Sequence, residues 1–217
     1  PGVRTSTPTR FCPFHHGSKI MPRMITTLVC LLLVASLLPA QVSLSAHNLQ
    51  GEIAGLTEIC QPCHTPHRAQ AGADSLWNHT LPAGTSFTMY PQSSVDGLVD
   101  PVPNEESLMC LGCHDGVTGI DSYGGATGNL NFTSADPENI GQDLSNDHPI
   151  SIDYDLAGYH GGHGLKDISN LGHGANPILY NNKVECASCH SVHGSANPYL
   201  LRVDNTDSAL CLACHNQ

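Results

Sequence analysis

The stretch Cys186-Ala-Ser-Cys-His-Ser-Val-His193 decides what kind of fold this chain can adopt. Its Cys-x-x-Cys-His pattern attaches c-type haem: the two thiols form thioether bonds to the haem, and the adjoining histidine becomes an axial ligand of the iron. Composition alone predicts far less than one chance copy of this pattern. The chain contains four: Cys60–His64, Cys110–His114, Cys186–His190 and Cys211–His215. The sequence therefore predicts four covalently bound haem c groups, numbered here in the order of their motifs.

The four motifs use eight of the ten cysteines. The predicted haem-attachment residues are Cys60, Cys63, Cys110, Cys113, Cys186, Cys189, Cys211 and Cys214. The histidines that follow are the predicted proximal iron ligands: His64, His114, His190 and His215. Zinc ribbons and disulfide frameworks also use paired cysteines. Both are disfavoured, because zinc does not require a histidine after every pair and adjacent CxxC pairs make a poor disulfide framework.

An internal duplication organises the chain. A unit consisting of an isolated histidine, a CxxCHxxH motif and a SxxCLxCH motif occurs twice. The predicted halves are residues 47–120 and 140–217, joined by a Gly/Asn-rich linker at 121–139. Each half leaves two spare histidines for two haems, which predicts bis-histidine ligation throughout. These predicted distal ligands are His47, His67, His148 and His193.

The spacing of the distal histidines suggests how they pair with the haems. His67 follows His64 too closely to hold the opposite face of the same haem, so it is expected to bind the second haem. By the same reasoning His193 is expected at the fourth haem and His148 at the third. His47 is then left for the first haem, or for a haem in another subunit.

Four further histidines, His79, His160, His163 and His173, have no place in the duplicated pattern. They are expected to be exposed loop histidines, as most polar residues in loops have no fixed role. The alternative is a surface metal site or a substitute distal ligand.

The first 46 residues resemble an upstream extension followed by a secretory signal peptide. A short basic region begins at Met21, and residues 25–40 form an apolar run shorter than the ~20 residues of a membrane span. Small residues precede an expected cleavage site just before His47. We therefore expect residues 1–46 to be removed, no membrane span in the mature protein, and export to the cell surface or, alternatively, to the periplasm.

Charge is distributed very unevenly. All 19 acidic residues but only four basic ones fall within residues 47–217, a formal charge of −15. Such a surface repels nucleic acid and anionic membranes. The favoured partners are cationic proteins, cations and oxidised mineral surfaces.

Composition also limits the fold. Aromatic residues make up 5% of the chain, which has 21 glycines and 15 prolines. We expect a mostly irregular, coil-rich chain around a haem core, as in a multihaem cytochrome c. Short helices are expected at the haem motifs and at 208–214, and few short strands at 149–154 and 178–184.

The motif order resembles that of small exported tetrahaem cytochromes with doubled CxxCH motifs, over essentially all of residues 47–217. Some members polymerise into extracellular filaments, or nanowires, in which a neighbouring subunit can supply an iron ligand. The resemblance implies a homopolymer of stacked bis-histidine haems that transfers electrons to redox proteins or extracellular acceptors, with His47 as a candidate bridging ligand. The alternatives are a monomeric periplasmic electron shuttle and, less favoured, a multihaem redox enzyme. No catalytic residues are expected, because the spare histidines leave no iron obligatorily open.

Overall fold

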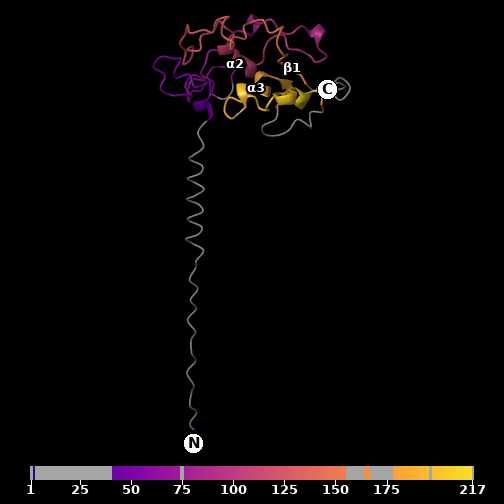
Figure 1. Cartoon of the computed structure of the whole chain (residues 1–217). Coiled ribbons are helices and arrows are strands. Elements are labelled where there is room, and N and C mark those ends of the chain that lie inside the picture. Colours follow the sequence, from indigo (N-terminus) through magenta and orange to yellow (C-terminus); the bar gives the residue numbers. More distant parts are fainter. Residues whose placement is uncertain are drawn as a thin grey trace. The chain divides into compact units, whose positions relative to one another are not determined.

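The computed structural model describes residues 2, 41–73, 76–154, 164–166, 178–195 and 197–216. Contacts divide the chain into two units, Pro1–Pro39 and Ala40–Gln217, and nearly all described residues belong to the second (Figure 1). Most of the expected signal peptide lies outside the described residues, as do His160, His163 and His173. Within the described ranges, no helix is long and apolar enough to cross a membrane.

The second unit is mostly coil, which confirms the expected fold class. Among the described residues the α-helices are α2 (Glu105–His114), α3 (Cys186–Cys189) and α4 (Ala209–Cys214). A two-stranded sheet pairs β1 (Ile152–Asp153) with β2 (Lys183–Val184). Single 3-10 turns are η1 (Gln41–Leu44), η2 (Gly84–Ser86), η3 (Gln92–Ser94), η5 (Pro198–Leu200) and η6 (Thr206–Ser208).

The longest helix, α2, contains the second haem motif. Glu105 and Glu106 lie in its first turn, where negative charge interacts favourably with the helix dipole. The helix ends because the next residues favour a turn. The Asp115 carboxylate accepts the backbone N–H of Val117 at 2.8 Å, and Gly116 has φ +69°, a conformation that favours glycine.

The small sheet joins segments that are distant in sequence. Its antiparallel strands pair Ile152 with Val184 and Asp153 with Lys183. The Lys183 ammonium lies 2.6 Å from the Asp153 carboxylate and 3.1 Å from that of Asp100. Figure 1 shows β1, α2 and α3 side by side within this unit. The sheet therefore ties β1 to the segment before α3, and the Lys183–Asp100 ion pair ties the segment before α2 to both.

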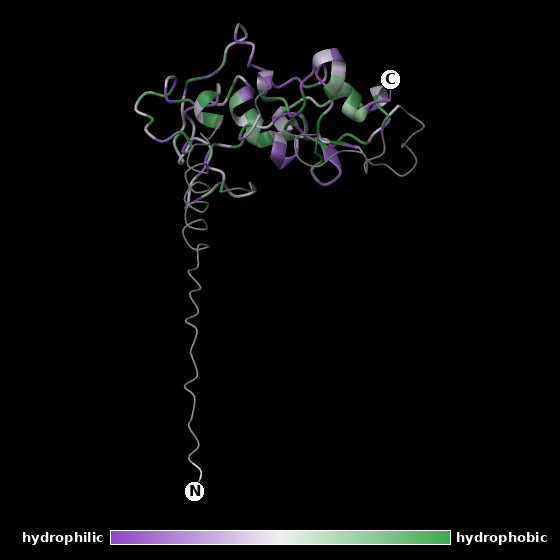
Figure 2. Ribbon diagram, turned by 60° about the horizontal axis from the view of Figure 1, so that its bottom comes forward, coloured by the Kyte–Doolittle hydropathy of each residue, from purple (hydrophilic) through white to green (hydrophobic). Residues whose placement is uncertain are grey.

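The side-chain core is small. Figure 2 shows hydrophobic segments interleaved with hydrophilic ones along the coil. Two separate clusters of buried apolar residues occur among the described residues: Ile53, Leu56 and Ile120 in one, Phe87, Leu111 and Leu144 in the other. Three buried side chains per cluster are few for a unit of this length, so the chain depends on other contacts for order.

Candidate haem-binding site

All four CxxCH motifs adopt the same local backbone. In the first, third and fourth motifs the histidine N–H donates to the carbonyl of the first cysteine, at 2.8, 3.1 and 2.8 Å. The second motif lies within α2. Residues three apart share a face of a helical turn, so both thiols of each motif lie on the same side. This is the arrangement that two thioether bonds to one haem require.

The second and third motifs meet at their first cysteines. The Cys110 thiol donates to the Glu106 carbonyl at 3.7 Å, and its closeness to the Cys186 thiol raises the pKa of Cys110 and lowers the pKa of Cys186. Helices α2 and α3 are packed against each other at this point. The two attachment sites nearest the middle of the sequence are therefore adjacent in space.

The outer motifs continue this arrangement. Burial and then the neighbouring Cys63 thiol raise the pKa of Cys113 to about 12. At the other end, burial and then the Cys214 thiol raise the pKa of Cys189 to about 11. Thiols influence each other's pKa only when they are close. The four attachment sites thus follow one another in space in the order in which they occur in the sequence.

Histidine rings come together in pairs. A bond between a metal and an imidazole nitrogen is about 2 Å long, and the nitrogen lies roughly 1 Å from the ring centre, so two histidines on opposite sides of one iron have centres about 6 Å apart. Three pairs of histidine rings among the described residues have this spacing: His47–His114 at 6.1 Å, His64–His193 at 5.8 Å and His148–His215 at 6.5 Å. Each pair consists of one predicted proximal and one predicted distal ligand, so these residues fit a haem iron.

These pairs differ from the ones expected from motif spacing. His114 is paired with His47, not with His67, and His215 is paired with His148, not with His193. Spacing along the chain was a poor guide, because the partners of His114 and His215 come from segments that precede their motifs by many residues. Neither His67 nor His190 has a histidine ring partner in the described part of the chain, and both are exposed.

Hydrogen bonds fix the ring orientation of several predicted ligands. A metal-binding histidine usually donates its other ring N–H to a carbonyl or carboxylate, which selects the tautomer and leaves Nε2 free. Three rings place Nδ1 against a backbone carbonyl: His114 with Glu138 at 2.7 Å, His190 with Tyr199 at 2.8 Å and His148 with Pro149 at 3.0 Å. Their Nε2 atoms are therefore available to iron.

The surroundings of two other ligands favour the neutral imidazole. Burial lowers the pKa of His47, and the rings of His114 and His190 lower it further. Burial and then the His148 ring likewise lower the pKa of His215. The buried Nδ1 of His47 has no hydrogen-bond partner among the described residues, as expected of an atom beside a site for another group. Neutral imidazole is the form that binds metals.

The first motif also borders a hollow. A surface hollow of about 520 Å³ is lined by residues that include Cys60, His64, Asn78 and Gly124. Ligand pockets typically measure 300–1,000 Å³. An attachment cysteine and its iron-binding histidine therefore face a space in the size range of a bound cofactor.

His79 was not recognised from the sequence, and its expected position in an exposed loop is wrong. Its side chain is 1% exposed. Its Nδ1 lies 3.0 Å from the Thr80 carbonyl and its Nε2 lies 3.0 Å from that of Gly119. Nε2 also lies 3.5 Å from the Cys113 sulfur, so the buried His79 ring packs directly beside the second motif. The duplicated pattern has no counterpart of this histidine and could not have revealed it.

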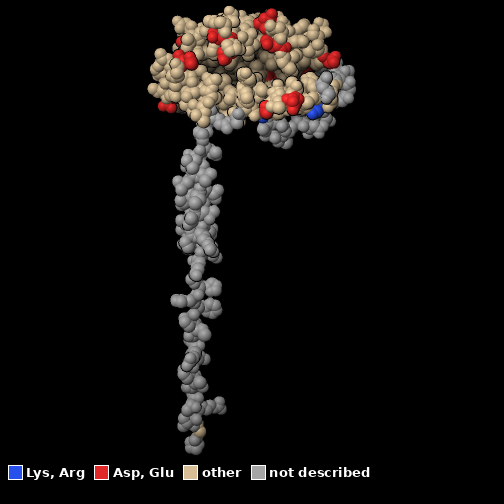
Figure 3. Space-filling model, in the orientation of Figure 1, with Lys and Arg blue, Asp and Glu red and all other residues tan. Residues whose placement is uncertain are grey.

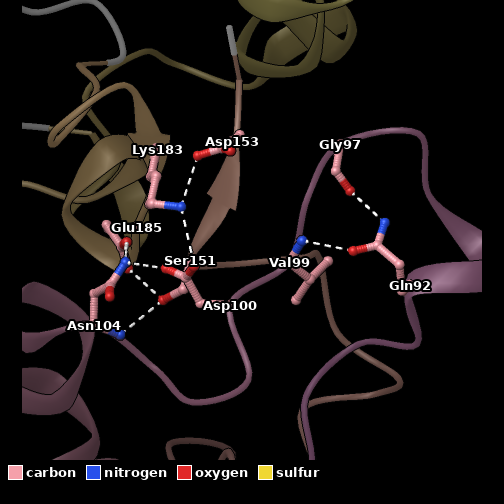
Figure 4. A network of polar contacts seen from close by, with 9 residues as sticks. All are labelled: Gln92, Gly97, Val99, Asp100, Asn104, Ser151, Asp153, Lys183 and Glu185. Carbon is pink, nitrogen blue, oxygen red and sulfur yellow. Dashed lines mark hydrogen bonds and ion pairs between the residues drawn. The ribbon is translucent and has the colours of Figure 1, made fainter. Parts of the chain in front are cut away.

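Glu185 was also missed. Its carboxylate is buried and accepts a hydrogen bond from Ser107 at 2.5 Å. Asn104 and Ser151 donate to the same carboxylate at 2.9 and 3.0 Å (Figure 4). It also accepts the backbone N–H of Ser188 and so caps α3. This one side chain connects α2, β1 and α3 beside the second and third motifs. The donors lie far from Glu185 in sequence, and no local pattern marks them.

A tight contact at the second motif gives a testable prediction. A Cβ on Gly112 would lie 2.7 Å from the Thr80 carbonyl oxygen and 3.1 Å from Nδ1 of His79. Gly112→Ala should therefore lower the free energy of unfolding of the haem-loaded protein by about 1–3 kcal/mol, measured by denaturant titration.

The duplication supplies a control, because Ala213 occupies the equivalent position in the fourth motif. Ala213→Gly should cost about 1 kcal/mol or less, the usual difference in helix propensity. A Gly112→Ala loss no larger than this would contradict the close approach of α2 to Thr80 and His79.

Turns that present two thiols on one face, together with paired histidine rings, define a protein that binds haem c. The sequence profile of the family described as doubled CXXCH motif (Paired_CXXCH_1) matches residues 180–217, which contain the third and fourth motifs. No curated protein matches the chain. The doubled motif indicates covalent haem c and points to electron transfer.

Proposed function

We propose that this protein is a tetrahaem c-type cytochrome that transfers electrons. The observation that carries the proposal is the succession of four CxxCH turns, with paired histidine rings about 6 Å apart at three of them. Haem would supply reversible one-electron chemistry. The cysteines would hold each haem, and the histidines would occupy both axial positions of its iron and so exclude a substrate.

The exposure of the motifs supports a route through the protein. Cys60 in the first motif and Cys211 in the fourth are exposed, whereas the other six motif cysteines are partly buried. Electrons would therefore enter and leave near the first and fourth attachment sites. On the face shown in Figure 3, Asp and Glu side chains are spread over the described surface and Lys and Arg are few. A redox partner with a basic docking face would suit this surface.

The proposal extends to export and to assembly into an extracellular filament. Its support is the signal-peptide pattern, the resemblance to filament-forming cytochromes, and the exposed outer motifs, which would let electrons pass between copies. His47 is not proposed as a bridging ligand, because its ring lies against His114 of the same chain. The second candidate is a soluble electron shuttle. The His47–His114 contact favours it, because the iron of the second haem would then need no ligand from a neighbouring subunit.

The central experiment counts and titrates the haems of protein purified from cells that attach haem c. Mass spectrometry should find four haems per chain, and absorption and electron paramagnetic resonance spectra should show low-spin iron at all of them. Every haem should be reduced and reoxidised reversibly in a potentiometric titration. Fewer than four haems, or a stable high-spin haem that binds nitrite or carbon monoxide, would contradict the proposal and favour an enzyme.

Filament formation needs its own measurement. Material sheared from the cell surface should show filaments with an unbroken row of haems across subunit boundaries in cryo-electron microscopy. Discrete particles that each contain four haems would instead establish the shuttle.

A further inference from the structure

We propose that axial ligation crosses between the two halves of the chain. His193 from the second half would bind the first haem iron opposite His64. In return, His67 from the first half would bind the third haem iron opposite His190. The second and fourth irons would be completed within their own halves, by His47 and His148. This assignment rests on the proposed presence of four haems and adds which histidine serves which iron.

The first step is the His64–His193 pair. The two rings are 5.8 Å apart with planes inclined by 32°, although they belong to opposite halves of the duplication. His193 belongs to the CxxCHxxH motif that attaches the third haem. As a ligand of the first haem iron, it would therefore bind a haem attached to the other half of the chain. The same spacing at two other pairs makes this one part of a pattern.

The second step is the repeat. His47–His114 and His148–His215 are equivalent pairs, because each joins the isolated histidine of a half to the second motif of that half. These two pairs, at the second and fourth haem sites, are therefore related by the internal duplication. Applying the same symmetry to His64–His193 gives a pair between His190 and the remaining distal candidate, His67.

The third step concerns the two histidines of that last pair. Nδ1 of His190 lies 2.8 Å from the Tyr199 carbonyl, which leaves Nε2 for a metal. Both His67 and His190 are exposed, so their rings have room to come together around a haem. Helices α2 and α3, which carry the cysteines of the second and third motifs, are packed against each other, so these two haem sites are adjacent.

This ligation would also hold the two halves of the chain together. Two irons would each hold one ligand from either half, so the halves could not separate without breaking an iron–histidine bond. This agrees with contacts that keep Ala40–Gln217 as one compact unit. Covalent attachment would be local to each motif, whereas ligation would require the whole unit to close.

The test combines the loss of one haem with the loss of one distal ligand in the full-length chain. Cys60→Ala/Cys63→Ala removes the first haem, and Cys211→Ala/Cys214→Ala removes the fourth. Into each of these backgrounds His193→Ala is introduced. The readout is the number of high-spin ferric haems in electron paramagnetic resonance and resonance Raman spectra. His193→Ala should create one high-spin haem where the fourth haem is missing and none where the first is missing.

His148→Ala is the matched control, and its dependence should be reversed. It should create a high-spin haem where the first haem is missing and none where the fourth is missing. For the fourth pair, His67→Ala should have no effect once Cys186→Ala/Cys189→Ala has removed the third haem. A His193→Ala effect that disappears with the fourth haem would overturn the proposal in favour of ligation within each half.

A second measurement covers the case in which a three-haem variant fails to accumulate. Haem-resolved cryo-electron microscopy or crystallography of the unaltered protein should show the His193 imidazole at the iron of the haem attached to Cys60 and Cys63. Any other residue there would overturn the assignment. These outcomes differ from failure of the proposed function, which would appear first as fewer than four haems in the mass of the unaltered protein.

Discussion

Without haem attachment, the chain should form no stable structure and should be degraded. Ordering each residue costs about 1–2 kcal/mol of backbone entropy. Among the described residues, the buried apolar side chains that could offset this are two clusters of three residues each, together with Tyr154. The three histidine pairs in the described part of the chain lie close together, but no hydrogen bond between their rings holds them in place. Haem would supply both the missing buried surface and the missing connections.

The measurement compares the chain exported by cells with and without a working haem-attachment system. Immunoblots should show at least a tenfold loss in the cells that cannot attach haem. Haem-free protein recovered from inclusion bodies should give a far-ultraviolet circular dichroism spectrum of coil and no cooperative melting. An exported protein that contains no haem serves as the control for secretion. A haem-free chain that melts cooperatively would show that the side chains alone suffice.

Replacing Glu185 should be the most damaging single substitution outside the haem motifs. Its carboxylate accepts hydrogen bonds from the side chains of Asn104, Ser107 and Ser151 and from the backbone of Ser188. Glu185→Ala leaves the Ser107 and Ser151 hydroxyls and one Asn104 N–H without this acceptor, at about 1–3 kcal/mol for each unsatisfied group. The Ser188 N–H keeps its bond to the backbone carbonyl of residue 185. The expected loss is on the order of 3–5 kcal/mol, measured as the free energy of unfolding of the haem-loaded protein.

Glu185 should also make stability depend on pH. Burial raises the pKa of Glu185 above that of an ordinary glutamate, and Glu106 adds to this, against the lowering effect of Ser107, Asn104 and Ser151. Because the folded pKa is raised, the contribution is fully present below the ordinary glutamate pKa. It is lost as pH rises through the folded pKa. The free energy of unfolding should therefore fall as pH rises from the ordinary glutamate pKa through the raised pKa of Glu185.

Glu185→Gln isolates this effect, because the amide has nearly the same shape and does not titrate. The variant should lose less stability than Glu185→Ala, and its unfolding free energy should no longer fall across the window. Glu52→Gln, at an exposed position, is the matched control and should leave the pH profile unchanged. Identical profiles for Glu185→Gln and the original protein would show that Glu185 is not the titrating group.

The sequence by itself determined the attachment chemistry. Each CxxCH motif is complete within five consecutive residues, and one helical turn is enough to place its thiols and histidine together. The coil-rich fold also followed from sequence, because a chain rich in Gly and Pro has little to support long helices or strands. The short helix predicted at 208–214 is confirmed as α4 (Ala209–Cys214), whose Ala and Leu residues are good helix formers.

Only the tertiary structure decided which histidines meet and which polar groups are buried. The His193 ring lies near that of His64, and the Glu185 carboxylate accepts hydrogen bonds from Ser107 and Asn104. Each of these contacts joins segments that are far apart in the chain. His79 is buried because two carbonyls close around it. Spacing in sequence does not specify such contacts, because a flexible loop reaches many partners at nearly equal entropic cost. The partner is chosen by how all the segments pack at once.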